Sequence, residues 1–239
     1  MPVGILLALV VAATPGDCYN RANEAYEAGD YLGAIELYDS AAAQVTHADI
    51  LFNRGNAYFK TGQTGRAIAD YSRAWVLNPY DPEPRQNLEF CRAYRPDKTA
   101  TLPNPLVRFL VAMLRVLDLG LVKLLTGALF LLALAALALL FIRGGRAWVW
   151  VSAGLGALCL YSFLSWMSWS QAVGPDRAVV VVPEVVLRSG PGEDYKDIVV
   201  VHDGLEGSIR SRRGGYVLLQ VPGGTGGWAD SSAVLRIFP

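Results

Sequence analysis

Two long uncharged runs in the middle of the chain constrain its fold more than any other feature. Residues 124–142 and residues 147–169 contain no Asp, Glu, Lys or Arg. At about 1.5 Å of rise per residue, a helix over the shorter run is roughly 28 Å long, close to the ~30 Å hydrocarbon core of a bilayer. Neither run carries the polar stripe of a helix that lies half-buried in a soluble protein. The sequence therefore predicts two transmembrane helices, over residues 124–142 and 147–169.

The two runs are separated by only four residues, Arg143, Gly144, Gly145 and Arg146. A link this short makes the helices an antiparallel hairpin, so the parts of the chain before and after it lie on the same side of the membrane. Arginines favour the cytoplasmic side, which indicates a cytoplasmic turn and flanking parts outside the cytoplasm. Small residues in the second run are expected to let the two helices pack closely: Ala153, Gly154, Gly156 and Ala157.

An apolar segment also opens the chain. Residues 3–13 are uncharged and mostly aliphatic, but they are too few to cross a bilayer as an ordinary helix. Small residues precede a break at Pro15 and Gly16, as at a signal-peptidase site. We predict a signal peptide over residues 1–13, which would export the part that follows.

Residues 17–95 contain an internal repeat with an offset of 33 residues. The coincident pairs are Asn23 and Asn56, Gly29 and Gly62, Ala34 and Ala67, Ile35 and Ile68, Tyr38 and Tyr71, and Ala41 and Ala74. Each copy has two apolar stripes of helical spacing around a glycine turn, which predicts two helix–turn–helix pairs, and residues 81–94 predict a capping helix. The repeat resembles the tetratricopeptide repeat (TPR), whose pattern the second copy matches at Leu51, Gly55, Tyr58, Ala67, Tyr71, Ala74 and Pro79.

The TPR resemblance implies that the inner face of the array binds an extended peptide or a partner helix. In the family's register Asn23 and Asn56 take equivalent inward positions, with Phe52 and Phe59 nearby and Arg85 on the capping helix. Two amides and a guanidinium can hold a carboxylate. Against such a clamp, Tyr19 stands where it would need Lys, and Glu89 adds a negative charge. The alternative is that the asparagines only bind neighbouring turns.

The segment between the repeats and the first apolar run divides in two. Residues 96–105 form a linker that contains Pro, Thr and Lys. Residues 106–123 have helical spacing, and their charged residues Arg108, Arg115, Asp118 and Lys123 fall within an arc of roughly 140°. This pattern predicts an amphipathic helix in the membrane interface. The alternative is an extended cap that packs on the repeats.

Residues 176–239 change to short β-branched runs between Gly and Pro residues, which predicts a small barrel. They resemble a bacterial SH3 domain in three segments: Leu187-Arg188-Ser189-Gly190-Pro191, Gly214-Gly215-Tyr216-Val217 and Gly227-Trp228-Ala229. Tyr195, Tyr216 and Trp228 are candidates for a ligand groove. The alternative for Trp228 is that it fills the interior of the barrel.

No residue pattern predicts catalysis or a cofactor. The histidines His47 and His202 fall in different parts of the chain, and Cys18, Cys91 and Cys159 form neither a CxxC pair nor a metal-ligand cluster. Twenty-one basic residues balance 21 acidic ones, so no charge excess indicates a nucleic-acid partner. We therefore expect no catalytic residue, no metal, no cofactor and no enzyme activity.

Together these segments predict a multidomain membrane protein. Its parts are an all-α TPR helical array, a transmembrane α-hairpin and a C-terminal all-β SH3-like barrel. Their order resembles the BatE proteins of Bacteroides-aerotolerance operons. That resemblance implies a non-enzymatic scaffold or adaptor in the bacterial cytoplasmic (inner) membrane, with both binding modules facing the periplasm or exterior.

The BatE resemblance also implies protein partners, namely von Willebrand A-domain membrane proteins and a MoxR-type AAA+ ATPase. An alternative function is a cell-wall sensor or tether, in which the SH3-type part binds peptidoglycan.

Overall fold

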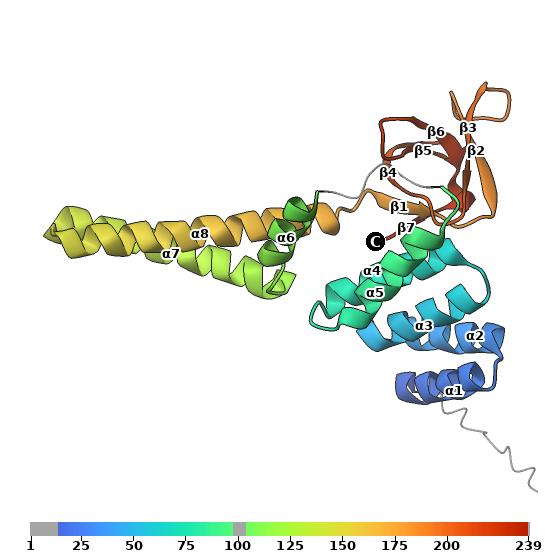
Figure 1. Ribbon diagram of the computed structural model, residues 1–239, viewed down its shortest axis with the longest axis horizontal. Coiled ribbons are helices and arrows are strands. Elements are labelled where there is room, and N and C mark those ends of the chain that lie inside the picture. The colour runs from blue at the N-terminus through green and yellow to red at the C-terminus, as the bar shows by residue number, and fades with distance from the viewer. Residues whose placement is uncertain (1–13, 98–103, 239) are drawn as a thin grey trace, which may run out of the picture.

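A computed structural model describes residues 14–97 and 104–238 of the chain. The expected signal peptide, residues 1–13, and most of the expected linker lie outside these ranges. The chain has two regions: a body of five helices and a sheet, and a long helical hairpin that extends away from it (Figure 1).

Five helices form the first part of the body: α1 (Pro15–Glu27), α2 (Tyr31–Ala42), α3 (Ala48–Lys60), α4 (Thr64–Leu77) and α5 (Pro82–Tyr94). Thr14 and Asp17 form a capping box at the start of α1, and the Asp81 side chain caps α5. Gly29 and Gly62 follow α1 and α3 with φ of 83° and 76°, a conformation in which glycine ends a helix without steric cost. Each helix packs on the next along the chain.

Small residues let paired helices approach closely. Ala34 and Ala67 are fully buried, and a Cβ on Gly55 would lie 2.8 Å from the Tyr71 ring. Tyr71 therefore occupies the space that the missing side chain leaves between α3 and α4.

Seven strands form one antiparallel sheet in the order β3-β2-β6-β5-β4-β1-β7. The strands are β1 (Arg177–Val180), β2 (Glu184–Arg188), β3 (Asp197–His202), β4 (Glu206–Arg213), β5 (Tyr216–Gln220), β6 (Gly226–Asp230) and β7 (Val234–Arg236). Alternate residues such as Val217 and Leu219 on β5 point into a core between the curved parts of the sheet. A short 3₁₀ helix, Ser231–Ala233, precedes β7.

The helices and the sheet share a core, because α4 packs on β1 and β7. Ile68 belongs to the same buried cluster as Val179, Ile237 and Phe238. At the start of α4, Gly65 donates its backbone N–H to Asp203, and a Cβ on Gly65 would lie 2.0 Å from the carbonyl oxygen of Val180. Only glycine fits at that contact.

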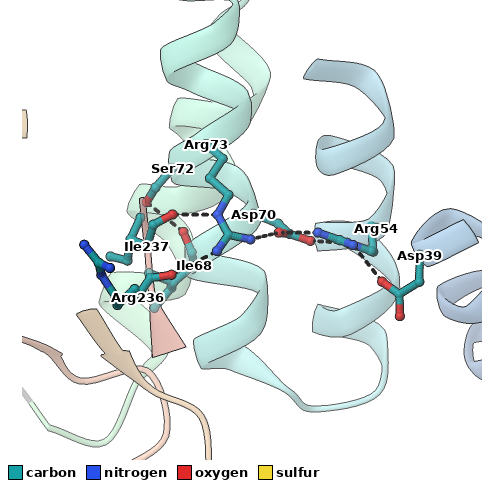
Figure 2. A network of polar contacts seen from close by, with 8 residues as sticks. All are labelled: Asp39, Arg54, Ile68, Asp70, Ser72, Arg73, Arg236 and Ile237. Carbon is teal, nitrogen blue, oxygen red and sulfur yellow. Dashed lines mark hydrogen bonds and ion pairs between the residues drawn. The ribbon is translucent and has the colours of Figure 1, made fainter. Parts of the chain in front are cut away.

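A polar network also connects the helices to the end of the chain (Figure 2). Asp70 is 2% exposed and accepts hydrogen bonds from Arg54 at 2.6 and 2.9 Å and from Arg73 at 3.2 Å. Arg73 also donates to the backbone carbonyls of Ile237 and Arg236, at 2.5 and 2.9 Å. A buried carboxylate is tolerated here because two guanidinium groups satisfy it.

The predicted fold class is therefore wrong. The body is one packed unit of five helices and a seven-stranded antiparallel sheet, so the chain is a two-region protein and not a multidomain array of a TPR unit and a separate SH3-like barrel. The physical reason is that α4 and the β1–β7 edge of the sheet bury residues against each other. Separate periodic patterns in the sequence do not reveal such a contact.

The second region comprises α6 (Pro105–Leu114), α7 (Leu119–Arg143) and α8 (Arg146–Ala172). α7 and α8 are long and apolar enough to span a membrane, and few of their side chains are buried. They form an antiparallel pair, and α6 lies across its base (Figure 1). The structure differs from the expected single helix over residues 106–123: α6 ends at Leu114, and Asp118 starts a new helix by capping α7.

α7 and α8 contact each other through hydroxyl side chains and not through the glycines of α8. The side-chain oxygens of Thr126 and Ser162 lie 2.7 Å apart, and Ser162 is buried. A Cβ on Gly154 or Gly156 would meet no atom within 4 Å. The expected close packing at those two glycines is absent from the described hairpin.

Candidate functional site

The candidate binding site lies on one face of the helical part, where α1, α3 and α5 present four asparagines. We call this surface, comprising Asn23, Asn53, Asn56 and Asn87, the asparagine face. Tyr38 donates to Asn23 Oδ1 at 2.5 Å, and Tyr71 donates to Asn56 Oδ1 at 2.7 Å. The two copies of the repeat therefore make the same tyrosine–asparagine contact.

Each of these carbonyl oxygens accepts a second hydrogen bond. Asn53 Nδ2 donates to Asn23 Oδ1, and Asn87 Nδ2 donates to Asn56 Oδ1, both at 3.1 Å. Asn53 Nδ2 also lies 3.0 Å from the Tyr19 hydroxyl. An asparagine has one acceptor oxygen and two donor hydrogens on its amide nitrogen. With Oδ1 occupied twice, the orientations of Asn23 and Asn56 are determined.

The amide nitrogens of Asn23 and Asn56 remain available to a ligand. Within residues 14–97 and 104–238 they donate to no other group. Both residues line a cavity of about 320 Å³, together with Tyr26, Glu27, Tyr38 and Asn53. The cavity thus offers amide donors to an acceptor such as a peptide carbonyl.

The buried tyrosines hold this arrangement in place. A tyrosine is protonated at physiological pH, and burial raises the pKa of Tyr38 and Tyr71 further, so both hydroxyls donate to their asparagines. The buried tyrosines therefore fix the positions of the asparagine side chains on this face.

An aromatic patch lies farther along the helices, where α3 meets α5. Its members are Phe59, Phe90 and Tyr94, with ring centroids 5.7 to 6.2 Å apart. Phe90 is 58% exposed and Tyr94 is 70% exposed. Exposed clustered aromatics are typical of a surface that binds an apolar side chain.

The structure separates the residues that sequence analysis grouped as one site. Asn23 and Asn56 lie on the asparagine face, and Phe59 belongs to the aromatic patch, whereas Phe52 packs on the Tyr71 ring at 5.9 Å against the core. Arg85 pairs with Glu89 at 3.3 Å and lines a different cavity. The guanidinium that a carboxylate clamp needs is therefore not at the asparagine cavity.

Asn53, Asn87, Phe90 and Tyr94 are not among the site residues that the sequence pattern predicts. Asn53 and Asn87 stand 34 residues apart. An offset of 33 therefore does not align this pair, whereas an offset of 34 does.

The three aromatic candidates for a ligand groove lie on β5 (Tyr216), on β6 (Trp228) and in the connection between β2 and β3 (Tyr195). Tyr216 and Trp228 lie on the outer face of β5 and β6, since their neighbours Val217 and Ala229 are the buried ones. Tyr195 is half-exposed and covers Gly190, where a Cβ would lie 2.3 Å from its ring. Trp228 therefore does not fill the interior.

The side chains of Cys91 and His202 are buried or bonded to neighbouring residues. Burial raises the pKa of the Cys91 thiol to about 12, which keeps it protonated. His202 contacts Asp97 through its backbone N–H at 2.6 Å and its ring at 3.0 Å. Within residues 14–97 and 104–238, no group of three His, Cys, Asp or Glu side chains is placed to hold a metal.

Comparisons with known proteins leave the family open. No protein-family model matches the chain, and a search of curated proteins finds no match. The asparagine face is thus the strongest observation that bears on function.

Proposed function

We propose that this protein is a membrane-anchored, non-enzymatic adaptor that binds an extended segment of a partner protein along the asparagine face. The observation that carries the proposal is the pair Asn23 and Asn56, whose acceptor oxygens are occupied and whose amide donors line a cavity. An extended peptide presents backbone carbonyls at regular intervals, which repeated donors are suited to bind. The aromatic patch beside α5 would take an apolar side chain of the same segment.

The hairpin supports membrane attachment. The helices that precede it and the sheet that follows it pack together, so both must lie on one side of any membrane that the hairpin enters. Arg143 and Arg146 at the turn favour a cytoplasmic turn. On this proposal the hairpin sits in a bacterial cytoplasmic membrane and the body faces the periplasm or exterior.

The partners implied by the resemblance to BatE proteins, von Willebrand A-domain membrane proteins and a MoxR-type AAA+ system, stay predictions. The proposed mode of recognition does not depend on them. It requires only a partner with an exposed, extended stretch of chain.

The test uses peptides selected from a random library on the detergent-purified full chain. In Asn56→Asp and Asn23→Asp, a carboxylate still accepts from Tyr71 or Tyr38, but the amide donor is lost. Losing one hydrogen bond to a ligand costs about 1 kcal/mol, so each variant should bind the peptide roughly fivefold more weakly and the double variant more weakly still. Asn20→Asp adds the same charge to an exposed position of α1 and should leave binding unchanged. Equal binding by the double variant and Asn20→Asp would exclude the asparagine face.

Peptidoglycan binding by the sheet is the second candidate, favoured by Tyr216 and Trp228 on one outer face. Aromatic rings on an open surface suit stacking against sugar rings. Sedimentation of the full chain with purified peptidoglycan tests it: the wild type should sediment and Trp228→Ala should not. Absence of wild-type sedimentation would reject this candidate.

A further inference from the structure

A second cavity, of about 430 Å³, lies where the body meets the base of the hairpin. α4, α5, α6, the end of α8 and the start of β1 all contribute to its walls. Among the residues that the structure describes, four arginines line it, Arg85, Arg92, Arg115 and Arg177, together with one carboxylate, Glu89. The proposed adaptor function gives this concentration of positive charge no role.

Arg115 is the least neutralised of these arginines. Among the described residues it takes part in no ion pair, and its two hydrogen bonds go to the hydroxyl and carbonyl oxygens of Ser168, at 2.9 and 2.8 Å. The guanidinium lies 5.8 Å from the Trp75 ring centroid and 5.6 Å from that of Trp169. Burial, with the nearby charges of Arg177 and Arg85, lowers the pKa of Arg115 to about 10. Arg115 is still a cation at pH 7, held in place without an anion.

The other three arginines of the cavity are paired with carboxylates. Arg92 and Arg177 both bind Glu206, at 2.7 Å. Arg85 has Glu89 at 3.3 Å. Among the described residues, the four arginines of the cavity therefore face two carboxylates, Glu89 and Glu206, which leaves room for up to two further negative charges.

The position of the cavity indicates where such an anion comes from. Arg115 follows α6 and precedes α7, and Ala172 on the cavity wall is the last residue of α8. The cavity thus lies level with the ends of the two helices that are long enough to span a membrane. Beside it, α6 exposes the apolar side chains Leu106, Phe109 and Leu110. In a membrane, this is the depth of the lipid headgroups.

We propose that this cavity binds the phosphate of an anionic phospholipid headgroup, with Arg115 and Arg85 as its ligands and α6 lying among the neighbouring acyl chains. Guanidinium groups bind phosphate oxygens through paired hydrogen bonds, and a cation near the headgroups attracts an anionic lipid. The proposal rests on the membrane attachment proposed above but not on peptide binding. A lipid bound at the base of the hairpin would also fix the orientation of the body relative to the membrane.

The test is native mass spectrometry of the detergent-purified full chain titrated with phosphatidylglycerol or phosphatidylcholine. One phosphatidylglycerol should bind each protein with at least tenfold preference over phosphatidylcholine. Arg115→Gln should lower that affinity about tenfold, the loss expected for a charge-assisted hydrogen bond. Arg85→Gln should lower it about threefold to fivefold. Arg146→Gln, an exposed arginine at the other end of the hairpin, should leave it unchanged.

The same variants separate this proposal from the adaptor proposal. Arg85 is exposed and pairs only with Glu89 among the described residues, so Arg85→Gln should fold. If Arg115→Gln does not fold, the lipid affinity of Arg85→Gln tests the proposal. Both variants should keep wild-type affinity for the selected peptide. Equal lipid binding by wild type and Arg85→Gln, an equal loss in Arg146→Gln, or competition by millimolar inorganic phosphate that removes the lipid completely would each overturn the proposal.

Discussion

Arg92 of α5 and Glu206 of β4 form a two-point ion pair, with Nε and Nη2 of the arginine each 2.7 Å from a carboxylate oxygen. The two residues stand 114 positions apart, on either side of the hairpin in the sequence. Arg177 and Arg95 bind the same carboxylate, whose side chain is 13% exposed. This contact is a second link between the helices and the sheet, in addition to the packing of α4 on β1 and β7.

Replacing Glu206 should therefore lower the free energy of unfolding of the body. Glu206→Gln leaves three arginines around a neutral group, and removing one partner of a buried ion pair costs about 3–5 kcal/mol. Chemical denaturation of the full chain in detergent measures this change. Glu193→Gln, at an exposed position of the β2–β3 connection, is the control and should cost little. A change below about 1 kcal/mol in Glu206→Gln would mean that the contact does not hold the body together.

The same contact predicts a pH dependence. Burial raises the pKa of Glu206, but hydrogen bonds from Arg92 and the charges of Arg92, Arg177 and Arg95 outweigh burial and hold the pKa below its usual value. A lowered folded-state pKa contributes stability above the unfolded pKa of about 4.3 that is lost as the pH falls through the folded value. The stability difference between wild type and Glu206→Gln should be full at pH 7 and shrink below about pH 4. A difference that stays constant from pH 7 to pH 3 would contradict this assignment.

Gly65 should not tolerate a side chain. A Cβ there would lie 2.0 Å from the Val180 carbonyl oxygen and 2.6 Å from Asp203 Oδ1, and the first of these belongs to the backbone and cannot rotate away. Gly65→Ala should therefore push α4 from β1 and cost about 2 kcal/mol or more. Gly154→Ala, which places a Cβ in open space, is the matched control in the same denaturation assay.

Phe90 should affect binding more than stability. Its ring is 58% exposed and borders Phe59 and Tyr94. Phe90→Ala should weaken binding of the selected peptide about tenfold, the scale of an aromatic contact at an interface, while changing unfolding by less than about 1 kcal/mol. Unchanged peptide affinity in this variant would remove the aromatic patch from the site.

The local elements of this fold are predictable from the sequence, whereas their assembly is not. Apolar periodicity indicates the helices between Pro15 and Tyr94, and the uncharged runs indicate two helices of membrane-spanning length, because both signals depend on near neighbours in the chain. Asn23 and Asn56 were identifiable because the repeat places them in equivalent positions.

The docking of α4 on the sheet was not predictable in this way. Gly65, Asp70 and Arg73 read in the sequence as ordinary residues of a helix surface, yet they contact Val180, Arg54 and Ile237 in the body. Nothing in a helical period distinguishes an arginine that faces water from one that binds a carbonyl 164 residues away. The wrong fold class follows from this missing long-range information.

The asparagine face is the centre of the functional account, and photo-crosslinking tests it most directly. A photoreactive form of the selected peptide is bound to the full chain and irradiated, and the labelled residues are identified by mass spectrometry. The account predicts labelling of Tyr26 and Glu27 at the asparagine cavity and of Tyr94 in the aromatic patch. Labelling confined to the outer face of the sheet, around Tyr216 and Trp228, would contradict it.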